Sequence, residues 1–269
     1  MNRPLKKVMT FAAAAGLLLI VVADTLTRAS ALEVRPIQIT IVYDDYPFQA
    51  GLKTGHGFSC LVRGIEKTIL FDTGDENGEI LLQNLHALKV NPKDFDLVVI
   101  SHEHYDHVGG LAAFLRENNK VTVFLPASCN PDIVKSVADA GAKCILVKDS
   151  LEICKNVFLT GQVLFEQALI LNTDKGLAVI TGCAHPGIVN MLYRAKEILP
   201  NNIDLVLGGF HLRDKPEDTV KKIIGNFREL GVLRVGATHC TGDRAIQQFK
   251  VAYGENYVLL GVGKVLQIL

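Results

Sequence analysis

Hydrophobic and polar positions follow two alternating patterns along this chain. Short runs rich in β-branched residues are typical of strands, and stretches in which apolar residues recur every three or four positions are typical of helices. The runs predict strands at 37–42, 58–62, 68–71, 97–100, 121–125, 144–147, 168–171, 177–181, 205–207 and 232–237. The helical stretches lie at 79–88, 111–116, 131–140, 188–198, 216–230 and 243–253. Strands therefore come first, and strand and helix then alternate.

This order of elements predicts an α/β fold. Two similar strand-rich halves with helices outside them favour two sheets packed face to face, with a helical layer on each outer face. With 269 residues, 49% of them hydrophobic, the chain can bury a substantial core. No low-complexity linker divides it, so we expect residues 32–269 to form a single domain.

Residues 1–31 differ from the rest of the chain. Arg3, Lys6 and Lys7 precede an uncharged stretch at 8–23, and the small residues Ala-Ser-Ala follow at 29–31. This pattern predicts a signal peptide cleaved after Ala31, with an uncleaved membrane anchor as the alternative. In both cases we expect the protein to be exported, in the periplasm or outside the cell, and to meet a membrane only through this segment.

Charge and cysteine content narrow the choice of partners. The formal net charge is zero and no basic stripe is present, so we expect a small-molecule substrate and no nucleic acid. No pattern indicates an oligomeric state. The six cysteines lack paired C-x-x-C spacing, which excludes a zinc ribbon. Export would permit disulfides among Cys129, Cys144 and Cys154.

The segment at 101–110, SHEHYDHVGG, carries the strongest chemical signal. It places three imidazoles and a carboxylate within six positions, directly after the strand predicted at 97–100. Crowded imidazoles repel one another when protonated and need partners when buried, and a metal supplies that partner. Neutral imidazole and carboxylate are ligands of zinc, iron and manganese. We therefore predict that His102, His104, Asp106 and His107 bind one or two divalent ions, with zinc as the first choice and iron or manganese as alternatives.

Other candidate residues follow later predicted strands, where sites commonly gather. His185 and His239 each lie between a strand and a helix, and we expect both to be metal ligands. We expect them to bind one metal together with His102 and His104, while Asp106 and His107 complete a second. For His211 three roles are possible from the sequence: a metal ligand, an acid or base, or a structural residue. Asp72, in a Asp-Thr-Gly turn, is expected to accept a hydrogen bond from a ligating imidazole, or to serve that turn alone. His56 lies in a turn between two glycines.

These motifs together resemble the metallo-β-lactamase superfamily. The resemblance rests on the turn at 71–74, FDTG, on the segment at 101–110, and on the later histidines at strand ends. It implies an αββα four-layer sandwich with a metal site at one edge of the two sheets. It also implies that the site usually holds two metals, whose bridging hydroxide attacks the substrate.

The chain departs from the common superfamily pattern at two ligand positions. Where a Gly-His-Thr turn is usual, it has Thr-Gly-Gln at 160–162, followed by Glu166. Where a bridging aspartate is usual, it has Cys183, with His185 two residues later. The resemblance therefore implies that Glu166, Cys183 or His211 replaces a missing ligand. A metal-bound Cys183 would be a thiolate.

Four further segments are similar to one branch of the superfamily. They are GHGFS at 55–59, GCAHPGIVN at 182–190, GGFHL at 208–212 and THCTG at 238–242. This branch includes 7,8-dihydropterin-6-methyl-4-(β-D-ribofuranosyl)aminobenzene-5′-phosphate synthase, and the resemblance implies a transferase acting on a pterin diphosphate. An exported protein would not easily meet such a cytosolic substrate.

Three functions are consistent with these observations. The leading hypothesis is metal-dependent hydrolysis of a small ester, lactone or phosphoester, in which Asp106 helps to orient the attacking water and His211 donates a proton to the leaving group. The second is transfer from a pterin diphosphate to an acceptor, as in dihydropteroate synthesis. The third is metal binding without turnover.

Overall fold

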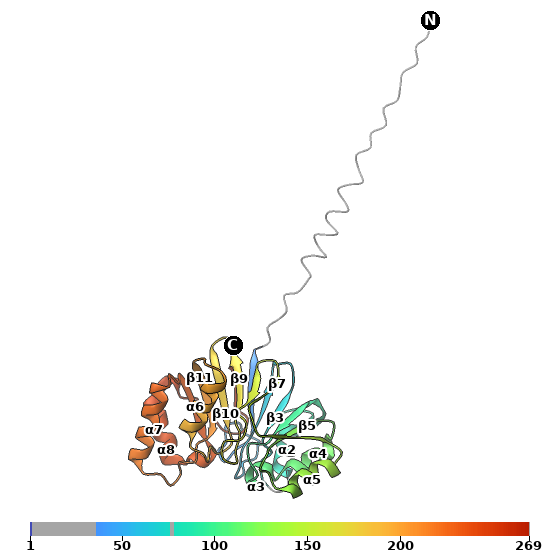
Figure 1. The fold of residues 1–269 in the computed structure, drawn as a ribbon, viewed down its shortest axis with the longest axis horizontal. Helices are drawn as coiled ribbons and strands as arrows, with labels where there is room; N and C mark the ends of the chain where they lie inside the picture. The colour runs from blue at the N-terminus through green and yellow to red at the C-terminus, as the bar shows by residue number, and fades with distance from the viewer. Residues whose placement is uncertain (2–35, 76–77, 269) are drawn as a thin grey trace. The chain divides into compact units, whose positions relative to one another are not determined.

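Two mixed sheets form the centre of the protein, and helices cover their outer faces (Figure 1). The computed structural model describes residues 36–75 and 78–268, together with Met1. Among them, the first sheet runs in the order β13 (Val265–Ile268), β1 (Ile37–Tyr43), β2 (Ser59–Arg63), β3 (Ile69–Phe71), β4 (Leu97–Val99), β5 (Thr122–Pro126) and β6 (Lys143–Val147). The second runs β12 (Arg234–Thr238), β11 (Ile203–Gly209), β10 (Gly176–Thr181), β9 (Leu169–Thr173), β8 (Val157–Leu159) and β7 (Leu151–Cys154).

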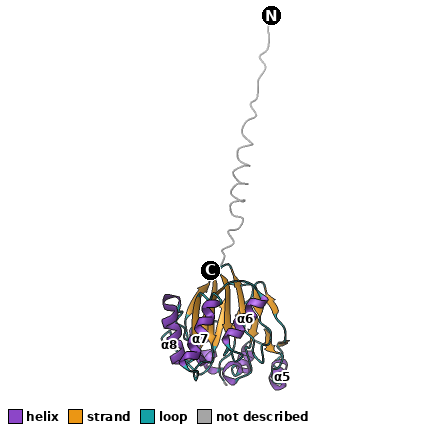
Figure 2. Cartoon of the chain, turned by 60° about the vertical axis from the view of Figure 1, so that its left-hand side comes forward, coloured by secondary structure: helices purple, strands orange, loops and turns teal. Residues whose placement is uncertain are grey.

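Helices divide between the two outer faces. The first sheet is covered by α2 (Glu79–Ala87), α4 (Leu111–Glu117) and α5 (Pro131–Asp139). The second is covered by α6 (Ile188–Ile198), α7 (Glu217–Glu229) and α8 (Asp243–Tyr253), which lie side by side in Figure 2. Four short helices complete the described chain: α3 (Tyr105–Val108), η1 (Pro92–Asp94), η2 (His239–Thr241) and η3 (Gly254–Asn256).

Alternation of side chains along the strands builds the layers. In β10, Ala178 and Ile180 point into the core between the sheets, whereas Leu177 and Val179 pack under the helices. Successive side chains of a strand point to opposite faces, so a strand that is apolar at every position can serve two cores at once. The αββα sandwich expected from the sequence is confirmed.

The structure differs from the expected elements in a few places. Strands β7, β8 and β13 were not predicted, and neither was the short helix α3, which Gly109 and Gly110 separate from α4. β7 is an edge strand whose residues are exposed or half-buried, so it lacks the apolar run that marks a buried strand. Each unpredicted strand is short, and its pairing partners rather than its own composition define it.

The predicted signal peptide or membrane anchor at 1–31 lies outside the described residues. Residues Pro36–Leu269 form one compact unit. Within the part of the chain that the structure describes, no helix has both the length and the apolar character needed to cross a membrane.

Candidate metal centre

Loops from both sheets meet at one edge of the sandwich. Segments that follow β3, β4, β10, β11 and β12 all contribute side chains there. Seven of the eight histidines form a continuous chain of rings, with neighbouring centroids 4.2–5.1 Å apart. They are His56, His102, His104, His107, His185, His211 and His239. The structure thus brings His185 and His239 to the cluster around His104.

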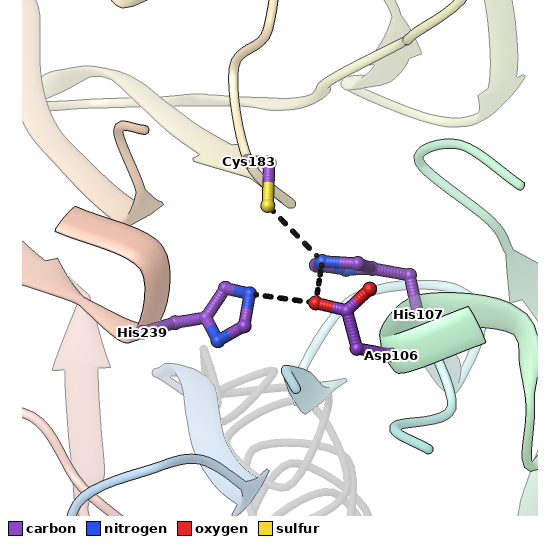
Figure 3. Close-up of side chains that lie close together, drawn as sticks. All are labelled: Asp106, His107, Cys183 and His239. Atoms are coloured by element: carbon purple, nitrogen blue, oxygen red, sulfur yellow. Dashed lines mark hydrogen bonds and ion pairs between the residues drawn. The ribbon is translucent and has the colours of Figure 1, made fainter. Parts of the chain in front are cut away.

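One group of potential ligands combines four buried side chains from three loops (Figure 3). It contains Asp106, His107, Cys183 and His239, whose ligand atoms lie within 4.8 Å of one another. The Cys183 Sγ is 3.2 Å from His107 Nε2, and Asp106 Oδ2 is 3.4 Å from His107 Nε2 and 3.2 Å from His239 Nε2. Imidazole, carboxylate and thiolate in this arrangement can bind a divalent cation.

A second group lies next to the first and shares its sulfur. It consists of His102, Cys183 and His185, again within 4.8 Å of one another. The His104 ring lies beside it, with centroids 4.6 Å from that of His102 and 4.7 Å from that of His185. Cys183 therefore lies between two potential metal positions, where the superfamily often has a bridging aspartate.

This grouping differs from the predicted one. From the sequence we expected His239 to share a metal with His102, His104 and His185. The structure places it instead with Asp106 and His107, because β12 is the far strand of its sheet and its end faces the start of α3. The partition of ligands depends on strand order, which the sequence pattern does not contain.

The free nitrogens of these histidines fit a metal. Nδ1 of His102 pairs with the Ser101 hydroxyl at 2.9 Å, which leaves its Nε2 buried with no hydrogen-bond partner among the described residues. The same is true of His239, whose Nδ1 pairs with Asp45. A buried polar atom without a partner is costly, and a bound cation would satisfy both nitrogens. The donor set fits a divalent ion, and the metal identity stays open between zinc, iron and manganese.

Asp72 anchors the loop after β4. It accepts hydrogen bonds from the Ser101 backbone at 2.6 Å, from the Ser101 hydroxyl at 2.7 Å and from His107 Nδ1 at 2.7 Å. Gly182 must be glycine at the next turn, since a Cβ there would lie 2.1 Å from the Ser101 hydroxyl. Asp72 thus orients His107 directly and His102 through Ser101, which is the contact that a supporting role requires.

Glu166 performs the corresponding task in the second half. Its oxygens accept hydrogen bonds from the backbone of Cys183, Ala184 and His185, at 2.7–2.9 Å, and from His185 Nδ1 at 2.9 Å. The carboxylate is fully buried and already bonded at both oxygens. It therefore orients the turn that carries Cys183 and His185. Of the three alternatives for a replacement ligand, Glu166 lies outside both ligand groups.

Charge balance within the cluster shifts several pKa values. Burial lowers the pKa of His107, but the charge of Asp72 outweighs this effect and raises that pKa to about 10. Burial likewise lowers the pKa of His239, while the carboxylates of Asp106 and Asp45 beside its ring raise it to about 9. For His102, burial and the neighbouring imidazoles keep the pKa well below its usual value, which favours the neutral ring that binds metals.

A cavity of about 350 Å³ opens onto the cluster. Its inner wall includes the largely buried Asp106, Cys183 and His185. Its outer wall is formed by exposed residues, namely His56, His211, Arg213, Asp214 and Lys215. Arg213 and Lys215 bring two cations to this wall, alongside Asp214. The cavity can therefore hold a small ligand, and its outer wall offers charge to an anionic group.

Backbone conformations at the site are unusual. Asp72, Ala184, His211 and His239 all have positive φ, between 50° and 58°. Residues other than glycine rarely adopt this conformation, which costs about 1–3 kcal/mol, and such residues cluster at functional sites. The hydrogen bonds described above hold these turns in place.

Several residues at the site were not singled out from the sequence. Asp45 accepts hydrogen bonds from His239 and His56, and Asp44 accepts from the Thr238 hydroxyl at 2.7 and 2.8 Å. Both follow β1, so the same rule about strand ends would have found them. They reach the site because β1 has an irregularity between Ile41 and Tyr43 that redirects the following residues.

The disulfides that export would permit are not formed in the structure. All six, including Cys129, Cys144 and Cys154, are free thiols in the structure. Cys240 was also not singled out, although it lies within 4.8 Å of Cys183 and His211.

This four-layer fold with a histidine-rich edge defines a class of metal-dependent proteins, and the comparisons agree. A family description of the metallo-beta-lactamase superfamily matches residues 52–126. The crystal structure of a metal-dependent hydrolase of the beta-lactamase superfamily is similar with a TM-score of 0.73 and 33% identity, covering 86% of this chain and 99% of that one. The chain belongs to the metallo-β-lactamase superfamily.

Two relatives come from Methanocaldococcus jannaschii. One is 7,8-dihydropterin-6-methyl-4-(beta-D-ribofuranosyl)-aminobenzene-5'-phosphate synthase, 28% identical over 86% of this chain and 96% of its own length. The other is an uncharacterised protein, 30% identical over 79% of this chain and 93% of its own length. The resemblance to the pterin-linked branch is thereby confirmed.

Proposed function

We propose that this protein is a metal-dependent hydrolase of a small ester, lactone or phosphoester, and that a phosphoester matches its cavity best. The observation that carries the proposal is the pair of buried nitrogens of His102 and His239 without a hydrogen-bond partner among the described residues, which belong to the two ligand groups that share the Cys183 sulfur. The superfamily fold and the enzymatic names of its relatives support an enzyme.

The two ligand groups would hold one divalent ion each. Asp106, His107 and His239 would bind the first, His102 and His185 the second with His104 beside them, and Cys183 would be shared. When bound, such ions lower the pKa of a coordinated water and polarise the bond under attack. The sulfur ligand favours zinc or iron over manganese.

The remaining residues of the cavity would handle protons and charge. Asp106 offers a carboxylate oxygen that can accept a hydrogen bond from the attacking water and orient it. The hydrogen bond with Cys240 raises the pKa of His211, so more of this imidazole stays protonated and able to donate to the leaving oxygen. Arg213 and Lys215 would bind the anionic part of the substrate.

The test uses the full chain, stripped of metal with a chelator and reloaded with zinc, iron or manganese. Hydrolysis of a chromogenic phosphodiester, a carboxylic ester and a lactone is then followed in water alone. We expect hydrolysis only after reloading, and fastest with the phosphodiester. The absence of hydrolysis for every metal and every substrate class would overturn the proposal.

Transfer to an acceptor is the second candidate, favoured by the 28% identity with the pterin-phosphate synthase over most of both chains. The same cavity could hold a diphosphate while an amine displaces it. An assay with a pterin diphosphate, with and without an aromatic amine, separates hydrolysis from transfer. A transferase forms product only when the diphosphate and the amine are both present. Metal binding without turnover predicts that the loaded protein is inert in both assays.

Export is part of the proposal too, and it depends only on residues 1–31. Sequencing the N-terminus of protein recovered from a secreting host tests it. A chain that begins at Leu32 supports export with cleavage, whereas an intact N-terminus in the cytoplasm contradicts it.

A further inference from the structure

Two thiols lie together at the inner end of the cavity. The sulfur atoms of Cys183 and Cys240 are within 4.8 Å of each other and of a ring nitrogen of His211. The Cys240 thiol also contacts the Cys183 carbonyl oxygen at 3.8 Å. Cys183 takes part in both ligand groups described above, whereas Cys240 takes part in neither. In the proposed hydrolysis the second thiol therefore binds no metal, and its one contribution is the hydrogen bond that raises the pKa of His211.

Strand order explains why these thiols meet. Cys183 follows β10 and Cys240 follows β12, and β11 lies between those two parallel strands. The middle strand ends at Gly209, which has no side chain to separate them. A Cβ at this position would lie only 2.6 Å from the Cys240 Sγ. The glycine thus leaves room for sulfur to approach sulfur across the end of β11.

Both thiols can be reached from solvent through the cavity. Each is largely buried, with 3% of Cys183 and 8% of Cys240 exposed, yet both line the cavity of about 350 Å³. Hydrogen peroxide is scarcely larger than water and fits such a space. Cys60, by contrast, is enclosed in the core between the sheets.

We propose that Cys183 and Cys240 are a reversible oxidation site, at which a peroxide converts the two thiols into a disulfide and withdraws the shared sulfur from the metal centre. The sulfur of Cys240 attacks one peroxide oxygen, which gives a sulfenic acid and releases water. The sulfur of Cys183 then displaces the hydroxyl of that sulfenic acid as a second water, and the S–S bond forms. Two thiols are oxidised and one peroxide is reduced to two waters.

Closure requires the loops after β10 and β12 to move. The sulfur atoms must come within about 2 Å of each other. A disulfide sulfur is no longer a thiolate, and the thiolate is the form that binds metal. The consequence for metal binding, though not the crosslink itself, rests on the proposed function. In the oxidised protein, the two metal positions would lose the ligand they share.

The experiment uses the full chain loaded with cobalt, whose absorption reports thiolate coordination. The protein is treated with hydrogen peroxide and then with dithiothreitol, and three quantities are measured: free thiols, the crosslinked peptide by mass spectrometry, and the cobalt–thiolate absorption. We expect a crosslink between Cys183 and Cys240, loss of two thiols and loss of the absorption. Dithiothreitol and fresh cobalt should restore the two free thiols and the cobalt–thiolate absorption.

Variants make the result specific. Cys240→Ser should retain the cobalt–thiolate absorption before treatment and form no crosslink. Excess peroxide should carry its Cys183 past the sulfenic acid to the sulfinic and sulfonic acids, which dithiothreitol does not reduce. Cys154→Ser removes a half-buried thiol of the edge strand β7, outside the ligand groups and the cavity, and should behave as wild type. A thermal melt checks that both variants fold.

Some outcomes would overturn the inference. The inference fails if peroxide treatment of the wild type yields no peptide that joins Cys183 to Cys240. It also fails if the thiols lost in Cys240→Ser are recovered with dithiothreitol as fully as those of the wild type. If the crosslink forms but no sample shows cobalt–thiolate absorption, the oxidation site is supported and the proposed thiolate-bound metal centre is contradicted. The two proposals therefore fail separately.

Discussion

The two halves of the protein contribute to the centre in opposite ways. The first half supplies His102, His104, Asp106 and His107 from one loop, so their proximity is set locally. The second half supplies one or two residues from the end of each of three strands, and these meet only because β10, β11 and β12 lie next to one another. Local sequence therefore fixes one side of the site, while sheet order fixes the other.

Each half also has its own buried carboxylate that holds its ligands. Asp72 binds the 101–107 loop, and Glu166 binds the 183–185 turn. Removal of one or the other should therefore disturb different ligands, and the contrast between the two can be measured.

The largest expected effect is that of Asp72→Ala. It would leave the Ser101 backbone N–H and His107 Nδ1 buried without an acceptor, and we expect a loss of roughly 3–5 kcal/mol in the free energy of unfolding. Urea unfolding measures the loss. Asp72→Asn retains one acceptor oxygen and should lose less. Equal stability of Asp72→Ala and wild type would show that this loop does not depend on its carboxylate.

Asp44 connects the halves, because it follows β1 and binds Thr238 at the end of β12. Burial raises its pKa from 3.8 to about 7. The pKa of Asp44 is higher in the folded state than in the unfolded state, so folding favours the protonated carboxyl group. This contribution to stability is complete below about pH 4 and is lost as the pH rises through 7.

We therefore expect Asp44→Asn to gain stability relative to wild type between about pH 4 and pH 8. The gain should reach roughly 2–4 kcal/mol, because one pKa unit corresponds to about 1.4 kcal/mol. Chemical unfolding of chelator-treated protein at a series of pH values measures it. If the free energy of unfolding varies with pH in the same way for Asp44→Asn and the wild type, the raised pKa of Asp44 is contradicted.

Glu166→Gln should have an intermediate effect, confined to the second half. The amide retains an acceptor oxygen but weakens the bond that orients His185, and we expect metal affinity to fall about 10–100-fold. Competition with a chelating dye measures the affinity. Glu197→Gln, the same change at an exposed position, is the control and should leave affinity unaltered. Similar losses in the two variants would show that Glu166 has no specific role.

The smallest effect is expected from Arg213→Ala at the outer wall of the cavity. Loss of one cation should raise KM for a phosphodiester about tenfold, leave kcat nearly unchanged and leave KM for an uncharged ester unaffected. Steady-state kinetics at low and high salt measure this. Arg228→Ala, on the outside of α7, is the matched control. An equal change with the uncharged ester would exclude recognition of the anion.

Much of the fold was predictable, because the buried strands and amphipathic helices carry their own periodicity. The edge strand β7 was not, since its residues are exposed or half-buried and show no apolar run. At the site, residue type and strand-end position indicated His102, His185 and His239. The role of Glu166 was not predictable, because a carboxylate bonded to backbone N–H groups resembles a potential ligand until those bonds are seen.

The sequence by itself determined the layered fold, the presence of a histidine-rich centre and the residue types available to it, because hydrophobic period and ligand chemistry are local properties. Only the tertiary structure decided that His239 joins Asp106 and His107, that Cys183 lies between two ligand groups, and that Cys240 reaches it across Gly209. These facts depend on which strands are neighbours and how closely their ends approach, and long-range packing, rather than any local pattern, sets both.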